Sequence, residues 1–280
     1  MSKTYVITGG TSGIASALLK RIVSDNAVFA SFRREDRKEE LSKISPNIYP
    51  FYIDFSKPET IKPASDYLHS KCTKIDTLIN AAGCVAAGPA EKIEMSEIRR
   101  QFDVNVFGQL EFSRLLLDLM RDGKIINISS MASFGVFPFI SPYCASKRCL
   151  DMFFNSLLIE SKSNIKIVSI KPGVIATPLW GKSIEENSKY FDRFSGWERE
   201  MKFLAANAQK NEIKGLSPEK AADVILKADR AKNPKLSYTV GKDAFIASLV
   251  SKLPQSIQNS LIKFALGKRL EISEKSGMRE

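Results

Sequence analysis

Near its beginning the chain reads Tyr5-Val6-Ile7-Thr8-Gly9-Gly10-Thr11-Ser12-Gly13-Ile14-Ala15. The first four of these residues are apolar or β-branched and predict a buried strand, and the glycines after them predict a tight turn into a helix. Glycines let a ligand approach the backbone closely, and the free N–H groups at a helix N-terminus bind phosphate. The segment therefore predicts a dinucleotide site, and a tight turn with incidental glycines is the alternative. Ala15 stands where a third glycine is common, and a methyl group is tolerated there because the position serves helix–strand packing.

Short apolar runs alternate with helical patterns along the rest of the chain. Most runs are bounded by Gly, Pro or Asn, as buried strands are, and they span Tyr5–Thr8, Val28–Phe32, Ile48–Ile53, Thr77–Asn80, Lys124–Ser129, Ile165–Ile170 and Tyr238–Val240. The helix-like stretches between them include Ile14–Ser24, Glu59–Ser70, Ser96–Met120 and Pro142–Ser161. This alternation predicts an α/β doubly wound Rossmann fold of about seven parallel strands with helices on both faces. Because no linker or repeat interrupts it, we expect a single domain over residues 1–280.

The composition is that of a globular protein, with 280 residues, 44% of them hydrophobic and 26% charged, and a net charge of +11. Lysines and arginines are scattered without an Arg-rich tract, so no nucleic-acid partner is expected. The four cysteines are not spaced as a metal or redox pair, and the single histidine, His69, argues against a multi-His metal site. We expect free thiols, no metal, no signal peptide, no bilayer-spanning run and a cytoplasmic location.

The second strand-like run ends in Ala30-Ser31-Phe32-Arg33-Arg34. In an NAD site an acidic residue usually lies at this strand end and accepts hydrogen bonds from the ribose hydroxyls. Here a phenylalanine occupies that place. Arg33 can bond to and stack on a 2′-phosphoadenosine group, with help from the hydroxyls of Thr11 and Ser12. The sequence therefore favours NADP as the cofactor, and Glu35 and Asp36 lie close enough to keep NAD as the alternative.

A tyrosine and a lysine lie four residues apart in Tyr143-Cys144-Ala145-Ser146-Lys147. They share one side of a helix if the segment is helical, and an ammonium group beside a phenol favours the phenolate. We therefore expect Lys147 to lower the pKa of Tyr143 from its ordinary value near ~10 toward the range of a general acid or base. Taken alone the spacing is common in helices, so its meaning depends on the rest of the chain.

The motifs, taken in order, resemble those of the short-chain dehydrogenase/reductase family over about residues 1–240. They are Thr8-Gly9-x-x-x-Gly13-Ile14-Ala15, Asp54 after the third strand, Asn80-Ala81-Ala82-Gly83 after the fourth, Asn105 in the following helix, Ser130 after the fifth, Tyr143-x-x-x-Lys147, and Pro172-Gly173 with Thr177 after the sixth. Each motif alone is modest, and their conjunction is highly specific.

The resemblance implies a catalytic group of Ser130, Tyr143, Lys147 and Asn105. Tyr143 is expected to exchange a proton with the substrate oxygen, and Ser130 to donate a hydrogen bond to that oxygen. Lys147 is expected to hold the nicotinamide ribose, and Asn105 to anchor a water that links Lys147 to solvent. The implied cofactor-binding residues, besides Tyr143 and Lys147, are Gly9, Thr11, Ser12, Gly13, Ile14, Arg33, Asp54, Phe55, Asn80, Ala81, Gly83, Pro172, Gly173, Val174 and Thr177.

Some of these implied roles concern the two ends of the cofactor. Asp54 is expected to accept from the adenine amine with Phe55 beside the ring, and the turn 172–177 to hold the nicotinamide amide. Ser129 precedes Ser130, but the family spacing to the tyrosine favours Ser130. Cys144 is expected to be a packing residue, and a thiol that lines the substrate site is the alternative.

The strand–helix alternation loosens after the sixth strand. Residues 177–216 are expected to form a helical lid over an apolar pocket, and their large apolar side chains are Trp180, Phe191, Phe194, Trp197, Met201 and Phe203. Residues 243–268 hold two amphipathic stretches, Ala244–Leu253 and Ile257–Leu266. From Lys227 onward there are eleven Lys or Arg against five Asp or Glu. We expect a helical cap or a dimer face there, with weak peripheral membrane contact as the alternative.

The segment Tyr238–Ala244 followed by Leu253-Pro254 resembles the branch of hydroxysteroid and retinol dehydrogenases. That resemblance implies an apolar ketone, aldehyde or secondary alcohol as the small-molecule substrate, and a homodimer or homotetramer. The leading hypothesis is thus an NADP-dependent oxidoreductase. A non-catalytic NAD(P)-sensing regulatory protein on the same fold is the alternative, although such proteins typically lose the Tyr or the Lys. A sugar-nucleotide epimerase or dehydratase usually needs a larger C-terminal domain.

Overall fold

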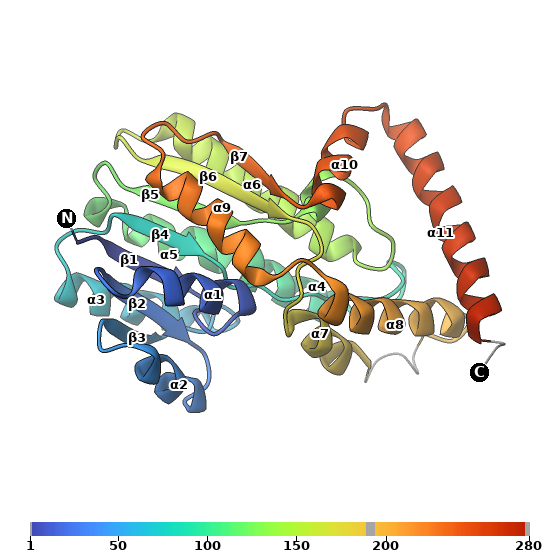
Figure 1. Ribbon diagram of the computed structural model, residues 1–280, viewed down its shortest axis with the longest axis horizontal. Coiled ribbons are helices and arrows are strands. Elements are labelled where there is room, and N and C mark those ends of the chain that lie inside the picture. The colour runs from blue at the N-terminus through green and yellow to red at the C-terminus, as the bar shows by residue number, and fades with distance from the viewer. Residues whose placement is uncertain (1, 189–193, 278–280) are drawn as a thin grey trace.

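A computed structural model describes residues 2–188 and 194–277 of the chain. Its centre is one seven-stranded parallel sheet with the strand order β3-β2-β1-β4-β5-β6-β7. The strands span β1 Thr4–Thr8, β2 Ala27–Phe32, β3 Ile48–Tyr52, β4 Thr77–Asn80, β5 Lys124–Ile128, β6 Lys166–Pro172 and β7 Ser237–Val240. The chain winds outward in one direction from β1 to β3 and in the other from β4 to β7, as Figure 1 shows. The doubly wound α/β fold predicted from the sequence is confirmed.

The helices cover both faces of this sheet. Their bounds are α1 Gly13–Ile22, α2 Asp36–Ile44, α3 Ile61–Lys71, α4 Met95–Phe102, α5 Gly108–Leu115, α6 Ser141–Glu160, α7 Leu179–Ser188, α8 Glu198–Lys214, α9 Pro218–Arg230, α10 Lys242–Val250 and α11 Gln255–Gly277. Short 3-10 turns add η1 Pro58–Thr60, η3 Leu117–Leu119 and η4 Met131–Phe134. The stretch Ser96–Met120, expected as one helix, is interrupted by a π-helical segment at Asp103–Phe107. Neither α2 nor α9 was among the predicted helices, although Pro at the first position of α9 is a helix-start signal.

Two apolar cores lie on the two faces of the sheet. One core packs α1 and α9 against the strands, with Leu18, Leu19 and Ile225 fully buried. The other packs α3, α5 and α6, with Phe112 and Phe154 at its centre. Because both faces are covered, the five inner strands are buried along nearly their whole length, which explains why they read as apolar runs, whereas the edge strands β3 and β7 are partly exposed.

Two helical segments lie beyond the α/β alternation. Residues 177–216 contain α7 and α8, so this region is helical as expected. The C-terminal segment forms α10 and the long α11, which extends past the predicted stretches and reaches α8 along one edge of the molecule (Figure 1). Among residues 2–188 and 194–277, no helix is both long and apolar enough to cross a bilayer.

A buried carboxylate fastens α9 to the start of the sheet. Asp229 accepts hydrogen bonds from Tyr5 Oη at 2.8 Å, Thr77 Oγ1 at 2.6 Å and Lys3 Nζ at 2.8 Å. Burial alone raises the pKa of this carboxyl, but the three donors outweigh it and lower the pKa below its ordinary value. The folded state therefore prefers the ionised form of Asp229, and this preference stabilises the fold.

We expect Asp229→Ala to lower the free energy of unfolding by about 3 kcal/mol, because it leaves buried donors without their acceptor. The contribution of Asp229 is present at neutral pH and is lost as the pH falls below about 4 and through the lowered folded pKa. Urea unfolding at several pH values measures both effects. Asp223→Ala on the same helix is the matched control, because its ion pair with Arg21 is exposed and contributes about 1 kcal/mol at most. Equal losses in the two variants would contradict this account.

Candidate active site

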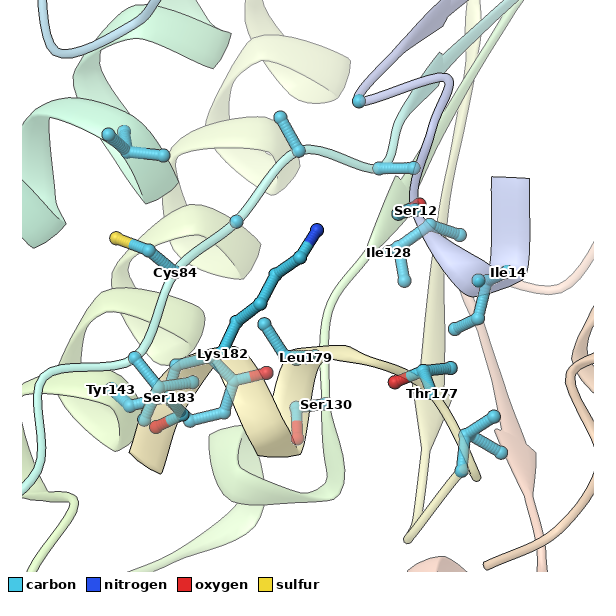
Figure 2. A pocket seen from close by; sticks show the side chains of 18 of the residues that line it. Ser12, Ile14, Cys84, Ile128, Ser130, Tyr143, Thr177, Leu179, Lys182 and Ser183 are labelled. Carbon is cyan, nitrogen blue, oxygen red and sulfur yellow. The ribbon is translucent and has the colours of Figure 1, made fainter. Parts of the chain in front are cut away.

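A deep pocket opens at the carboxyl ends of the strands, where β1 and β4 separate. This is the place where open parallel sheets bind ligands, since the chain leaves the two strands in opposite directions and parts their loops. Its lining comes from the loops after β1, β2, β3 and β4, the ends of β5 and β6, and helices α6 and α7. Figure 2 shows the side chains around it.

The turn after β1 is held in a shape that only small residues allow. Gly9 has a φ of +65°, and a Cβ there would lie 2.8 Å from the backbone of Ala82. A Cβ at Gly13 would lie 2.7 Å from Thr177 Cγ2. Ser12 caps α1, because its hydroxyl accepts from the N–H of Ala15 at 3.4 Å. The helix N-terminus therefore faces the pocket across a floor without side chains, which fits a pyrophosphate group.

Arg33 lies at the end of the pocket that the turn after β2 forms. Its side chain is exposed and lines the cavity, and no described carboxylate is within ion-pair distance of it. Glu35 and Asp36, the acidic residues that left NAD as the alternative cofactor, form ion pairs with residues other than Arg33. Asp36 accepts from Arg34 at 2.8 Å and Glu35 from Lys38 at 3.1 Å, and neither lines the pocket. This end of the site therefore presents a guanidinium without a described ion-pair partner, and neither Glu35 nor Asp36 lines it.

Asp54 and Phe55 also line the pocket, from the loop after β3. Asp54 Oδ1 accepts from the backbone N–H of Ser56 at 3.0 Å and from its hydroxyl at 2.7 Å. The Phe55 ring is buried against Phe112 and against Gly108, where a Cβ would lie 2.6 Å away. The ring is thus a packed wall of the site, and its position depends on the glycine in α5.

Two residues expected at the cofactor do not line the pocket. Asn80 is fully buried and donates to Asn127 Oδ1 at 2.9 Å and to Ser113 Oγ at 3.1 Å, so it ties β4 to β5 and α5. Val174 uses its N–H to donate to Asp243 Oδ2 at 2.7 Å. Its neighbour Ile175 lines the pocket instead. The sequence did not indicate Ile175, because a strand end carries no pattern that shows which backbone groups are already hydrogen-bonded.

Tyr143 and Ser130 both point into the cavity (Figure 2). Tyr143 lies in the first turn of α6, and Ser130 follows β5 and caps the short turn η4, where its hydroxyl accepts from the N–H of Ala132 at 3.1 Å. The Ser130 hydroxyl lies near the phenol and favours its ionised form. Lys147 comes one turn later on α6, with its Nζ 5.8 Å from the centre of the Tyr143 ring. The three residues that the sequence singled out for proton chemistry therefore meet in one place.

The pKa values of Tyr143 and Lys147 in the protein differ from those expected from the sequence. Burial raises the pKa of Tyr143 to about 12, although the Ser130 hydroxyl opposes the change. Burial also lowers the pKa of Lys147 to about 8, against the influence of Asp151. Lys147 donates to the carbonyl oxygen of Ile128 at 2.8 Å, and with a pKa of about 8 it is mostly charged at pH 7. Burial of the phenol is the larger effect, so the pKa of Tyr143 stays above its ordinary value. The expectation that Lys147 lowers the pKa of Tyr143 is therefore wrong for the protein alone. The phenol is a neutral proton donor at pH 7.

Asn105 lies in the π-helical segment and is fully buried behind the pocket. Its Oδ1 accepts from the N–H of Cys84 at 2.9 Å, and its Nδ2 donates to the Cys84 carbonyl at 3.0 Å and to Ser146 Oγ at 3.0 Å. Asn105 therefore fixes the loop after β4 beside α6. Gly83 in that loop leaves the space open, since a Cβ there would lie 3.6 Å from Lys147 Nζ.

The turn after β6 closes the pocket opposite the loop after β4. Pro172, Gly173 and Thr177 all line it, as expected. Gly173 has no room for a side chain, because its Cβ would fall 2.0 Å from Asp243 Oδ1. Asp243 at the start of α10 thus locks this turn from behind, a role that no local pattern indicates.

The lid contributes less to the pocket than the sequence predicted. Trp180 lines the cavity, whereas Phe194 and Met201 are buried in the protein and the ring of Trp197 packs on Phe139. None of these three lines the pocket, and neither does Phe203. Phe191 lies outside the described residues. The sequence could not separate lid packing from pocket lining, because both use large apolar side chains.

Several pocket residues carried no sequence signal. Apolar ones come from three elements and are Val85, Phe137, Ile140 and Leu179. Lys182 extends from α7 into the cavity (Figure 2), and Ser183 lies beside it in the chain. Cys84 lines the pocket, while Cys144 does not and is buried, as expected of a packing residue. Ser129 also borders the cavity, but its hydroxyl is buried.

Comparison with known proteins identifies the family. The short chain dehydrogenase family matches residues 3–188. An uncharacterized oxidoreductase of Bacillus subtilis, YusZ, is 29% identical, covering 93% of this chain and 97% of its own. The NADPH-dependent 3-dehydrocapnine reductase of Ornithobacterium rhinotracheale is 30% identical over 84% of this chain and 87% of its own. The crystal structure of a short-chain dehydrogenase from Streptomyces avermitilis superposes with a TM-score of 0.76 at 26% identity, over 96% of this chain and 97% of that one.

The chain belongs to the short chain dehydrogenase family, since the family match covers well over half of it and includes the whole of the pocket's lining up to α7. It is therefore an NAD(P)-dependent oxidoreductase. The resemblance read from the order of the motifs is confirmed at this level.

The pKa values of the buried pair predict a pH dependence. Lys147 loses its charge as the pH rises through about 8, whereas Tyr143 keeps its proton to about 12. We expect kcat/KM for carbonyl reduction, which reports the free protein, to fall above about pH 8 by up to tenfold per pH unit. Steady-state rates between pH 6 and about 10 measure this. Lys147→Arg remains charged throughout that range and should lose the decline, whatever its absolute rate. A flat wild-type profile, or the same decline in the variant, would contradict the assignment.

Proposed function

We propose that this protein is an NADP-dependent oxidoreductase that transfers a hydride between the nicotinamide and the carbonyl or secondary alcohol of an apolar small molecule. One observation carries the proposal: Tyr143 and Ser130 face the same cavity as the glycine turn after β1. A proton donor for a substrate oxygen and a place for a dinucleotide are thus parts of one site.

Tyr143 is the general acid in this scheme. With a pKa of about 12 it is protonated at neutral pH, so it can give its proton to a carbonyl oxygen as negative charge develops there. Ser130 donates a hydrogen bond to the same oxygen and stabilises that charge. Lys147 supplies positive charge beside the phenol and holds ribose hydroxyls. A neutral phenol favours reduction over oxidation, since oxidation needs the phenolate as a base.

The cofactor, when bound, supplies or accepts the hydride, and the protein orients it. The turn Gly9–Gly13 fits the pyrophosphate, because a Cβ at either glycine would collide with neighbouring atoms. Thr177 and the backbone of the turn after β6 would hold the nicotinamide amide. Asp54 and Phe55 would lie at the adenine. Asn105 and Asn80 act from behind the site, by fixing the loop and the strand that shape it.

Arg33 supports NADP as the preferred cofactor. It is exposed at the pocket, and the nearby carboxylates of Glu35 and Asp36 are held by other cations. A 2′-phosphate can therefore pair with the guanidinium without competition from an acid. The related NADPH-dependent 3-dehydrocapnine reductase agrees with this choice.

The substrate part of the pocket supports an apolar carbonyl compound. Phe137, Ile140 and Trp180 supply apolar surface near Tyr143, and Ser183 with Lys182 adds polar groups on the lid side. Such a mixture suits a largely apolar molecule with a few polar atoms that fix its orientation.

We expect Tyr143→Phe to lower the rate of NADPH-dependent carbonyl reduction by roughly 10²- to 10⁴-fold, because it removes the proton donor and keeps the ring. Stopped-flow or steady-state NADPH oxidation measures the rate, on a substrate found by testing steroids, retinoids, acyl ketones and small aldehydes. NADPH affinity should change little. Tyr49→Phe on β3 is the control, because its ring is surface-exposed and away from the pocket. Full activity in the Tyr143 variant would refute the proton-donor role and favour a sensing protein.

For Arg33→Gln we expect the KM for NADPH to rise about tenfold while that for NADH stays within about twofold, because one charge-assisted hydrogen bond to the 2′-phosphate is lost. Arg34→Gln is the control, since Arg34 is already paired with Asp36. If wild-type protein prefers NADH, or if the Arg33 variant weakens both cofactors alike, the 2′-phosphate role is wrong.

A further inference from the structure

The C-terminal helices expose large apolar side chains along one side each. On α10 these are Phe245, Ile246 and Leu249, all between 47% and 58% exposed. On α11 they are Ile257, Leu261 and Phe264, and Phe264 is 72% exposed. Positions three or four apart lie on the same side of a helix, so each helix carries a continuous apolar stripe. Six such residues in one segment exceed what scattered surface apolar residues explain.

The opposite sides of both helices are fixed to the protein. Ala244 of α10 is fully buried, and the half-buried carboxylate of Asp243 beside it accepts from the Val174 N–H. Gln258 of α11 is buried and donates to the Leu253 carbonyl at 2.7 Å, and Leu270 is also buried. Ala244, Gln258 and Leu270 are thus the buried positions among the described residues of the two helices, and the apolar stripes lie at other, exposed positions.

The charges around the stripes are mostly positive. Lys242 lies on the same side of α10 as its apolar residues, and Lys268 follows Phe264 by one turn. Three more exposed cations lie in the segment and are Lys252, Lys263 and Arg269, against one exposed acid among the described residues, Glu271. An apolar stripe flanked by cations is the pattern of a helix that lies in the surface of an anionic bilayer.

We propose that α10 and α11 form a docking surface for an anionic lipid bilayer. A second copy of the chain fits less well, because a symmetric contact through this face would bring the cations of one copy close to those of the other. The helices would lie on the bilayer and not cross it, since no described helix is apolar enough to span one. The surface also cannot be a cap on the pocket, because no described residue of α10 or α11 lines it.

The position of this surface connects it to the proposed reaction, and that link rests on the proposed function. Gln258 lies against Gly135, where a Cβ would be 3.5 Å from its Oε1. The next residue, Val136, is 47% exposed, and Phe137 after it lines the pocket. Docking would thus bring the apolar wall of the pocket near lipid and give an apolar substrate a short path out of the bilayer.

Flotation with vesicles tests the docking. We expect wild-type protein to bind vesicles of phosphatidylcholine with about one-third phosphatidylglycerol at low salt, and to bind pure phosphatidylcholine at least tenfold more weakly. High salt should weaken binding to the anionic vesicles. Leu261→Ser with Phe264→Ser should reduce binding by at least tenfold, because two side chains no longer leave water. Ile159→Ser with Ile213→Ser is the control, since these residues are the most exposed large apolar side chains on α6 and α8.

Two results would overturn the docking surface. One is no binding to anionic vesicles at low salt, or equal losses in the test and control variants. The other is a wild-type dimer in solution that the test variant converts to a monomer, which would assign the face to self-association. Reduction of a water-soluble carbonyl substrate should be unchanged in the test variant. A failure of docking is therefore distinguishable from a failure of the proposed chemistry, which Tyr143→Phe tests separately.

Discussion

The structure depends on a close approach of three backbone segments where β1 and β4 part. Gly9 lies against the backbone of Ala82, and Gly13 against Thr177 in the turn after β6. The loops after three strands therefore meet at the mouth of one pocket, and they can do so because Gly9 and Gly13 carry no side chain. A Cβ at Gly9 would face both a positive φ and a contact under 3 Å, so this approach leaves little choice of residue. Access of any ligand to the site depends on that opening.

Around this opening the protein uses burial to set charge states. The same desolvation that raises the pKa of Tyr143 lowers that of Lys147, since burial disfavours the phenolate and the ammonium alike. At pH 7 the phenol is therefore neutral and the ammonium group is still mostly charged. Asp229 shows the opposite outcome, because three donors overcome its burial and keep it ionised. The number of hydrogen-bond donors around each group decides which outcome prevails.

The helices outside the α/β alternation, α7, α8, α10 and α11, have different structural roles. The lid helix α7 supplies pocket residues, whereas α8 supplies none and buries Met201 and Ala208 in the protein. Asp243 links the C-terminal segment to the site, since it bonds to Val174 and occupies the space behind Gly173. The segment that presents an apolar stripe to the outside therefore also supports the turn that closes the pocket. A disturbance of α10 can reach the site through this single carboxylate.

The sequence by itself determined the fold class, the family and the positions of Tyr143, Lys147 and Ser130. It could do so because strand burial, glycine turns and helical spacing are local properties that leave a period or a spacing in the chain. Only the tertiary structure placed Asn80 and Val174 outside the pocket lining, brought Lys182 into it and buried Phe194 and Met201 away from it. It also reversed the expected pKa shift of Tyr143. These outcomes depend on which groups surround a side chain and how much water remains beside it, and residues far apart in the sequence decide both.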